Sequence, residues 1–119
     1  MGTHVLATQR VAENLTRQLL RPLGRFVFVG KEKPIPVYEV MAADKQAASE
    51  RSVALCQAFA EAFAVFRQER WAEAIAAFGR TLEAFPGDGP STFYLNLTTR
   101  YLTQGVPDES PTVVRLDSK

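Results

Sequence analysis

Few residues of the types that carry chemistry occur in this 119-residue sequence. His4 is the only histidine and Cys56 the only cysteine. His4 stands in a strand-like run with no cysteine or carboxylate pair at ligand spacing, so an ordinary strand histidine is favoured over a metal ligand or general base. Cys56 falls on an apolar helical stripe, where a buried inert thiol is favoured over a nucleophile that no histidine activates. The sequence therefore indicates neither a Ser–His–Asp nor a Cys–His site.

The acidic residues are dispersed instead of paired. A solvated helix face is the favoured interpretation for Asp44, Glu50, Glu61, Glu69 and Glu73. Turn positions explain Asp88, Asp108 and Glu109. A single cysteine also excludes an intrachain disulfide and the thiolate zinc sites. We expect no catalytic residue and no metal ligand in this chain.

The basic turn G-K-E-K-P, residues 30–34, is the one remaining candidate for chemistry. Gly30 gives the backbone conformational freedom, and Lys31 and Lys33 place positive charge at the tip, where it can meet a phosphate. A charged, soluble hairpin loop is the simpler alternative, because no helix N-terminus follows the glycine.

Two strand-like runs flank this turn and predict a hairpin over residues 22–40. The first run, Phe26–Val29, and the second, Ile35–Val40, are rich in β-branched and aromatic residues. Alternation along the first run sends Phe26 and Val27 to opposite faces of the sheet. We therefore expect both faces to be partly covered.

A strand and a helix are expected before the hairpin. His4–Ala7 predicts a short strand, and Thr8 is a suitable N-cap for the helix that follows. Pro22 and Gly24 are expected to end that helix. Its apolar stripe has a spacing of four residues and consists of Val11, Leu15 and Leu19.

Three helices are expected after Ala42, where the apolar period changes from two to about 3.6 residues. The first covers Asp44–Gln68, the second begins at Trp71 and ends at Pro86, and a third is capped by Ser91 and ends at Gly105. The short polar break R-Q-E-R at 67–70 favours antiparallel packing of the first two helices. The inner face of the first helix is expected at Leu55, Cys56, Phe59, Ala62, Phe63 and Phe66, and that of the third at Tyr94, Leu95, Thr98, Tyr101 and Leu102. The remaining tail is expected to be loose or to lie as a strap on the helices.

Residues 58–86 have the spacing of one tetratricopeptide-like unit. The matching positions are Ala62, Trp71, Ala74, Phe78 and Pro86. Glu69 stands where that repeat usually has glycine in the turn. One unit is short of the roughly three repeats that form an independent peptide groove. A helical interaction module remains an alternative function, and an open groove lined by side chains such as Arg67, Glu73 and Arg80 would favour it.

Composition narrows the possible partners. Lysine and arginine number 14 against 13 acidic residues, which removes the electrostatic attraction that non-specific binding to nucleic acid or an anionic membrane requires. No apolar run approaches the roughly 20 residues of a membrane span, and the N-terminus lacks a signal-peptide pattern. We expect a cytoplasmic chain without nucleic-acid or membrane contacts of its own, either free or as the cytoplasmic end of a membrane-anchored sensor.

The hairpin and the segments around it resemble the end of the class III adenylate/guanylate cyclase catalytic domain. The similar segments are G-T-H-V-L-A-T-Q-R-V-A-E-N-L at 2–15 and R-P-L-G-R-F-V-F-V-G-K-E-K-P-I-P-V-Y-E-V at 21–40. In that family a strand and helix precede an L-G strand, a Gly-Lys-x-x-Pro turn and a last strand ending V-Y-E-V. The helices after Ala42, with P-G-D-G-P-S at 86–91, resemble the tetratricopeptide-like tail that follows some bacterial cyclase domains.

The resemblance implies an α+β fold in two parts. Residues 1–41 would be a strand, helix and hairpin from the end of a ferredoxin-like cyclase sheet, and residues 42–119 a three-helix, tetratricopeptide-like extension. The expected partners are the rest of the catalytic domain and a second copy of the chain, paired through exposed strand edges.

The resemblance also implies the chemistry of the longer protein. Class III cyclases convert ATP or GTP to a cyclic nucleotide and diphosphate with two metal ions, Mg²⁺ or Mn²⁺. Their metal-binding aspartates and transition-state Asn/Arg pair belong to segments upstream of residue 2, so this chain alone should bind no catalytic metal and make no cyclic nucleotide. The phosphate-directed lysine of many relatives is Val29 here, and Lys31 is the nearest substitute.

Overall fold

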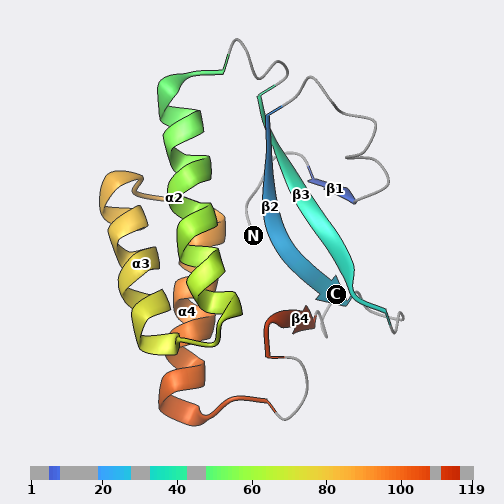
Figure 1. Cartoon of the computed structure of the whole chain (residues 1–119), viewed down its shortest axis with the longest axis vertical. Helices are drawn as coiled ribbons and strands as arrows, with labels where there is room; N and C mark the ends of the chain where they lie inside the picture. Colours follow the sequence, from blue (N-terminus) through green and yellow to red (C-terminus); the bar gives the residue numbers. More distant parts are fainter. Residues whose placement is uncertain (1–5, 9–18, 28–32, 43–47, 108–110, 116–119) are drawn as a thin grey trace.

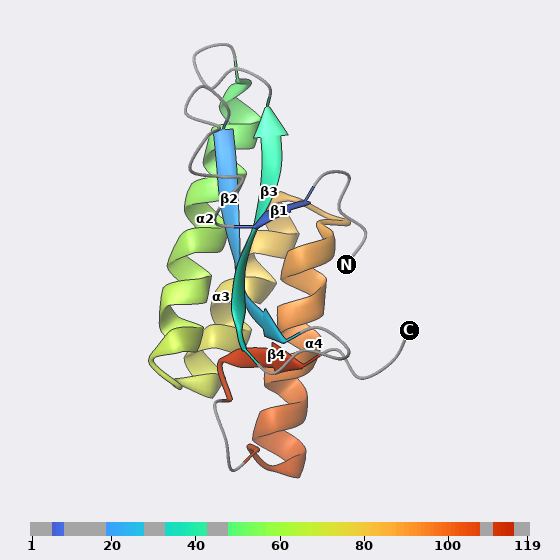
Figure 2. The same cartoon turned by 90° about the vertical axis from the view of Figure 1, so that its right-hand side faces the viewer.

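A computed structural model describes residues 6–8, 19–27, 33–42, 48–107 and 111–115. Within these residues a four-stranded sheet lies against three helices, which confirms the expected α+β class (Figures 1 and 2). The elements in chain order are β1 (Leu6–Thr8), β2 (Leu19–Val27), β3 (Ile35–Ala42), α2 (Glu50–Arg67), α3 (Trp71–Ala84), α4 (Gly89–Gln104) and β4 (Val113–Arg115).

The sheet has the strand order β1-β3-β2-β4. The expected hairpin is present, because β2 and β3 pair antiparallel with Arg21 opposite Glu39 and Phe26 opposite Ile35. β1 pairs antiparallel with the other edge of β3. The tail was expected to be loose or to lie on the helices, but its residues Val113–Arg115 form β4, parallel to β2.

β2 starts earlier than expected, and the predicted end of the first helix is wrong. Leu19, assigned to a helical stripe, is the first residue of β2, and Pro22 and Gly24 lie inside the strand. They interrupt the pairing: the register shifts between Pro22 and Gly24, where Leu23 is the extra residue of a bulge. β4 pairs only with residues 25–27, so Pro22 lies on a stretch of β2 with one described neighbour strand, a setting that tolerates proline.

The three helices run down, up and down again in Figure 1, so α2 and α3 are antiparallel, as predicted. α2 starts at Glu50, later than the predicted Asp44, because Ser49 caps it by accepting a 3.0 Å hydrogen bond from the Ser52 amide. Residues 43–47 lie outside the described part of the chain. α3 begins at Trp71 as predicted. Gly105, with φ 104°, caps the end of α4 at the expected place.

One core joins the sheet to the helices. Leu23, Phe26 and Val37 from the strands are buried together with Phe59 and Phe78 from the helices. Aromatic rings fill much of this core: Tyr94 packs on Phe59, Phe63, Phe66, Phe78 and Phe93. Leu102, expected on the inner face of the third helix, is 53% exposed, so that assignment is wrong. Leu102 follows Tyr101, the last buried residue of α4, and lies beside the buried stripe of that helix and not within it.

Candidate functional site

A buried ionic cluster connects the hairpin to the helices. It consists of Arg21 in β2, Glu39 in β3 and Asp88 just before α4, and we call it the clamp. Arg21 Nε donates a 2.9 Å hydrogen bond to Glu39 Oε1, and Nη2 also contacts that oxygen. Nη1 and Nη2 donate to the two carboxylate oxygens of Asp88 at 2.9 and 3.0 Å. One guanidinium thus bridges two strands and a helix in the bidentate geometry that arginine favours with carboxylates.

The strands place the first two members of the clamp. Arg21 and Glu39 are register partners, and partners across a ladder project to the same face. This face packs on the helices, so Arg21 is only 1% exposed to solvent and Glu39 only 8%. The Arg21 guanidinium carbon also lies 4.9 Å from the Phe59 ring centre, within cation–π range. Burial of a charge is costly unless it is paired, and here each guanidinium nitrogen of Arg21 has a carboxylate partner.

Asp88 has a second role as the N-cap of α4. Its Oδ2 accepts hydrogen bonds from the Ser91 amide at 3.1 Å and from the Ser91 hydroxyl at 2.6 Å. The prediction that Ser91 caps this helix is therefore wrong: Ser91 lies in the first turn and donates to the cap. Asp88, expected to be an ordinary turn residue, combines the cap with the clamp. Its negative charge also interacts favourably with the helix dipole.

The charges of the clamp stabilise one another. Burial alone would raise the pKa of Asp88, but hydrogen bonds from Arg21 and Ser91 outweigh that effect and hold the pKa below its ordinary value of 3.8. Burial alone would lower the pKa of Arg21, but its hydrogen bonds to Asp88 and Glu39 raise it. Arg21 and Asp88 therefore both stay charged at neutral pH.

A second contact between the sheet and α4 lies nearly two turns beyond Asp88, at Tyr94. The Tyr94 hydroxyl donates a 2.5 Å hydrogen bond to the carbonyl of Leu23, the extra residue of the β2 bulge. Gly24 follows with φ 117°, and a Cβ there would collide with the Tyr94 hydroxyl and lie 3.1 Å from the Phe63 ring. The bulge and the glycine thus allow α2 and α4 to approach the strand closely.

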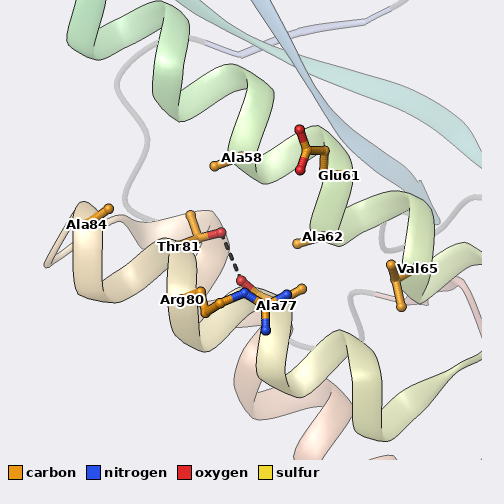
Figure 3. A pocket seen from close by; sticks show the side chains of 8 residues that line it. All are labelled: Ala58, Glu61, Ala62, Val65, Ala77, Arg80, Thr81 and Ala84. Atoms are coloured by element: carbon orange, nitrogen blue, oxygen red, sulfur yellow. Dashed lines mark hydrogen bonds between the residues drawn. The ribbon is translucent and has the colours of Figure 1, made fainter.

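A shallow groove lies between α2 and α3, and we call it the α2–α3 groove (Figure 3). Its volume is about 250 Å³. The lining residues are Ala58, Glu61, Ala62, Val65, Ala77, Arg80, Thr81 and Ala84. Of the groove residues expected from the sequence, it contains Arg80 but not Arg67 or Glu73.

The residues singled out in the sequence do not come together. Lys31, the candidate phosphate contact, and His4 lie outside the described residues, and Lys33 is exposed. Cys56 is half-buried, and burial raises the pKa of its thiol, which agrees with an inert side chain. The acidic residues expected on a solvated helix face are exposed where the structure describes them, at Glu50, Glu61, Glu69 and Glu73. The other acidic candidates lie outside the described residues, namely Asp44, Asp108 and Glu109. Within the described part of the chain, no group of three or more histidine, cysteine or acidic residues is placed to hold a metal ion.

Sequence reasoning missed the clamp, although one signal pointed to it. Val37 and Glu39 share a face of β3, and a carboxylate beside a buried valine needs a buried cation. Arg21 could not be matched to it because that residue was assigned to the end of a helix.

Comparisons with protein-family models, with curated proteins and with solved structures find no match. Among the described residues, no helix is both long and apolar enough to cross a membrane.

Proposed function

We propose that this chain is the C-terminal part of a class III nucleotide cyclase, with the last strands of the catalytic sheet joined to a tetratricopeptide-like helical tail. The longer protein would convert ATP or GTP to a cyclic nucleotide in the cytoplasm. This chain would have a structural and regulatory role and would be inactive alone. Mg²⁺ or Mn²⁺ would bind residues of the upstream segment.

One observation carries the proposal: three of the motifs that resemble the family contribute one residue each to the clamp. Arg21 precedes P-L-G, Glu39 belongs to V-Y-E-V, and Asp88 belongs to P-G-D-G-P-S. Two of these residues, Arg21 and Asp88, are 67 positions apart in the sequence and meet in one buried contact. If the end of the sheet and the helical tail fold as one unit, their motifs should contact each other. The clamp is such a contact.

The turn between α2 and α3 supports the tetratricopeptide-like part of the proposal. Glu69, which replaces the usual glycine of that repeat, has φ 63°. This is the left-handed conformation in which glycine is strongly favoured. The backbone therefore keeps the conformation of a glycine turn although the residue has changed.

The proposal extends to two contacts of the longer protein. Lys31 would reach a nucleotide phosphate from the hairpin tip, in place of the lysine that Val29 replaces. A second copy would pair through strand edges, since β1 and β4 are short edge strands within the described sheet. Sedimentation equilibrium should show a dimer at high concentration, and a strict monomer would count against this pairing.

The reading frame upstream of residue 1 tests the assignment. We expect it to encode about 130–150 further residues of catalytic domain, in keeping with ordinary domain sizes. They should include two metal-binding aspartates and an Asn/Arg pair. An in-frame stop codon directly upstream, with residue 1 as the true start, would overturn the proposal.

A helical interaction module is the second candidate function, and the α2–α3 groove is the observation that favours it. The groove contains Arg80, one of the three lining residues that this alternative names, but not Arg67 or Glu73. The two functions are compatible, because a tail that binds a partner can regulate the domain to which it is clamped.

A further inference from the structure

The α2–α3 groove has two walls of the same design. Each helix contributes four lining residues at positions i, i+3, i+4 and i+7: Ala58, Glu61, Ala62 and Val65 from α2, and Ala77, Arg80, Thr81 and Ala84 from α3. This spacing places all four on one helix face. Four of the eight are alanines, so the walls carry little side-chain volume.

The floor of the groove has no polar group in need of a ligand. The Thr81 hydroxyl donates a 3.0 Å hydrogen bond to the Ala77 carbonyl, the dashed line in Figure 3. Thr81 is 3% exposed and Ala62 is 1% exposed. What the groove offers is therefore apolar surface between small side chains.

The size of the groove favours side chains over a small molecule. Its volume of about 250 Å³ is below the roughly 300–1,000 Å³ of ordinary ligand sites. A cavity of about 150 Å³ accommodates one benzene ring. The groove thus has room for one or two large apolar side chains.

The charges at the two walls are of opposite sign. Glu61 on α2 and Arg80 on α3 are both exposed, and neither forms an ion pair with another described residue. In Figure 3 Glu61 projects from α2 on the side away from α3, and the Arg80 side chain lies along α3 beside Ala77. A partner that covers the groove would therefore meet a negative charge on one flank and a positive charge on the other.

α4 covers the other side of the same helix pair. It lies behind α2 and α3 in Figure 1, and Figure 2 shows it on the opposite side of α3 from α2. In stacked helical repeats each helix pair packs against neighbours on both sides. In such a stack the groove would face the next helix, and none of the described helices fills it.

We propose that the α2–α3 groove binds an amphipathic helix of a partner protein. A large apolar side chain of that helix enters the space between the alanines, a basic residue faces Glu61 and an acidic residue faces Arg80. This is helix-in-groove recognition, in which apolar anchors supply affinity and flanking charges set the orientation. The inference does not depend on the cyclase assignment, because it concerns only the helical surface.

Three synthetic helical peptides of about 18 residues, long enough to follow α3, test this binding. All carry leucine at positions i, i+3, i+4 and i+7. One has lysine on one flank and glutamate on the other, the second has lysine on both flanks, and the third has glutamate on both. Fluorescence anisotropy with the intact chain should show the tightest binding for the mixed peptide, by about two- to fivefold, the range of exposed ion pairs.

Charge variants of the protein should change this preference. Arg80→Glu makes both walls negative and should favour the all-lysine peptide, and Glu61→Lys makes both positive and should favour the all-glutamate peptide. Equal affinity for the three peptides with every variant, or no binding at millimolar concentration, would overturn the proposal.

Filling the groove supplies the steric test. Ala58→Leu should weaken binding of the mixed peptide about tenfold or more, because the leucine occupies the space of the anchor. Ala60→Leu makes the same change on an exposed position of α2 outside the groove and should leave the affinity unchanged. Ala84→Leu, at an exposed position in the groove, repeats the test if Ala58→Leu alters the fold. Unchanged binding by both groove variants would contradict the proposal, as would a homodimer that Ala58→Leu converts to monomer.

Discussion

The guanidinium of Arg21 and the carboxylate of Asp88 share two hydrogen bonds, of 2.9 and 3.0 Å, across 67 positions of the chain. Arg21 belongs to the sheet and Asp88 caps the last helix. Because the same arginine also binds Glu39, one side chain connects both strands of the hairpin to the N-cap of α4.

Removal of Arg21 should destabilise the fold strongly. Arg21→Met leaves Glu39 and Asp88 buried without a cation, and the loss of one partner of a buried pair costs about 3–5 kcal/mol. Arg25→Met is the matched control, because Arg25 lies in the same strand but is exposed; its effect should stay within about 0.5 kcal/mol. Urea denaturation measures the free energy of unfolding of both. Similar losses for the two variants would show that the clamp contributes nothing specific.

The clamp should lose its effect in acid. Asp88 has a lowered pKa in the folded protein, so its charge stabilises the fold above the ordinary value of 3.8, and this contribution is lost as the pH falls through the lower folded value. Asp88→Asn keeps an N-cap but removes the charge. The difference in unfolding free energy between the native protein and this variant should be constant near neutral pH and shrink below about pH 4. A difference that persists unchanged in strong acid would contradict this origin.

Substitution of three glycines by alanine distinguishes the cost of backbone strain from the cost of a steric collision at the β2 bulge. Gly24→Ala should combine a strained φ of 117° with a collision against Tyr94. Gly87→Ala has a similar φ of 86° but open space around it, so it should cost only the conformational strain, about 1–2 kcal/mol. Gly79→Ala, inside α3 with open space, should stabilise by about 0.5–1 kcal/mol. Thermal unfolding should rank the variants in this order, and equal losses at Gly24 and Gly87 would exclude the packing effect.

The helical half of the fold could be predicted from local signals. Trp71 and Phe78 recur at helical spacing, and Gly105 ends α4 in the conformation that glycine favours. The hairpin was also visible, since Ile35–Val40 has the residue types of a strand. These features are set by residues close together in the sequence, so one sequence is enough to predict them.

The clamp and the start of β2 could not be predicted in the same way. Leu19 fits a helical stripe and a strand equally well, and Pro22 and Gly24 are as typical of a helix end as of a bulge. The choice is made by pairing with β3, 18 positions away for Arg21 and Glu39. Asp88 resembled a turn residue because its partner lies in another part of the chain. Lys31 stays a prediction, since it lies outside the described residues.

Cyclic nucleotide formation is the most direct test of the proposed function. The assay supplies ATP or GTP with Mn²⁺ to this chain alone and to the longer protein encoded by the upstream reading frame. The longer protein should release a cyclic nucleotide and diphosphate, and this chain should show no turnover. Robust turnover by this chain alone, or an inactive longer protein without the metal-binding aspartates, would contradict the assignment.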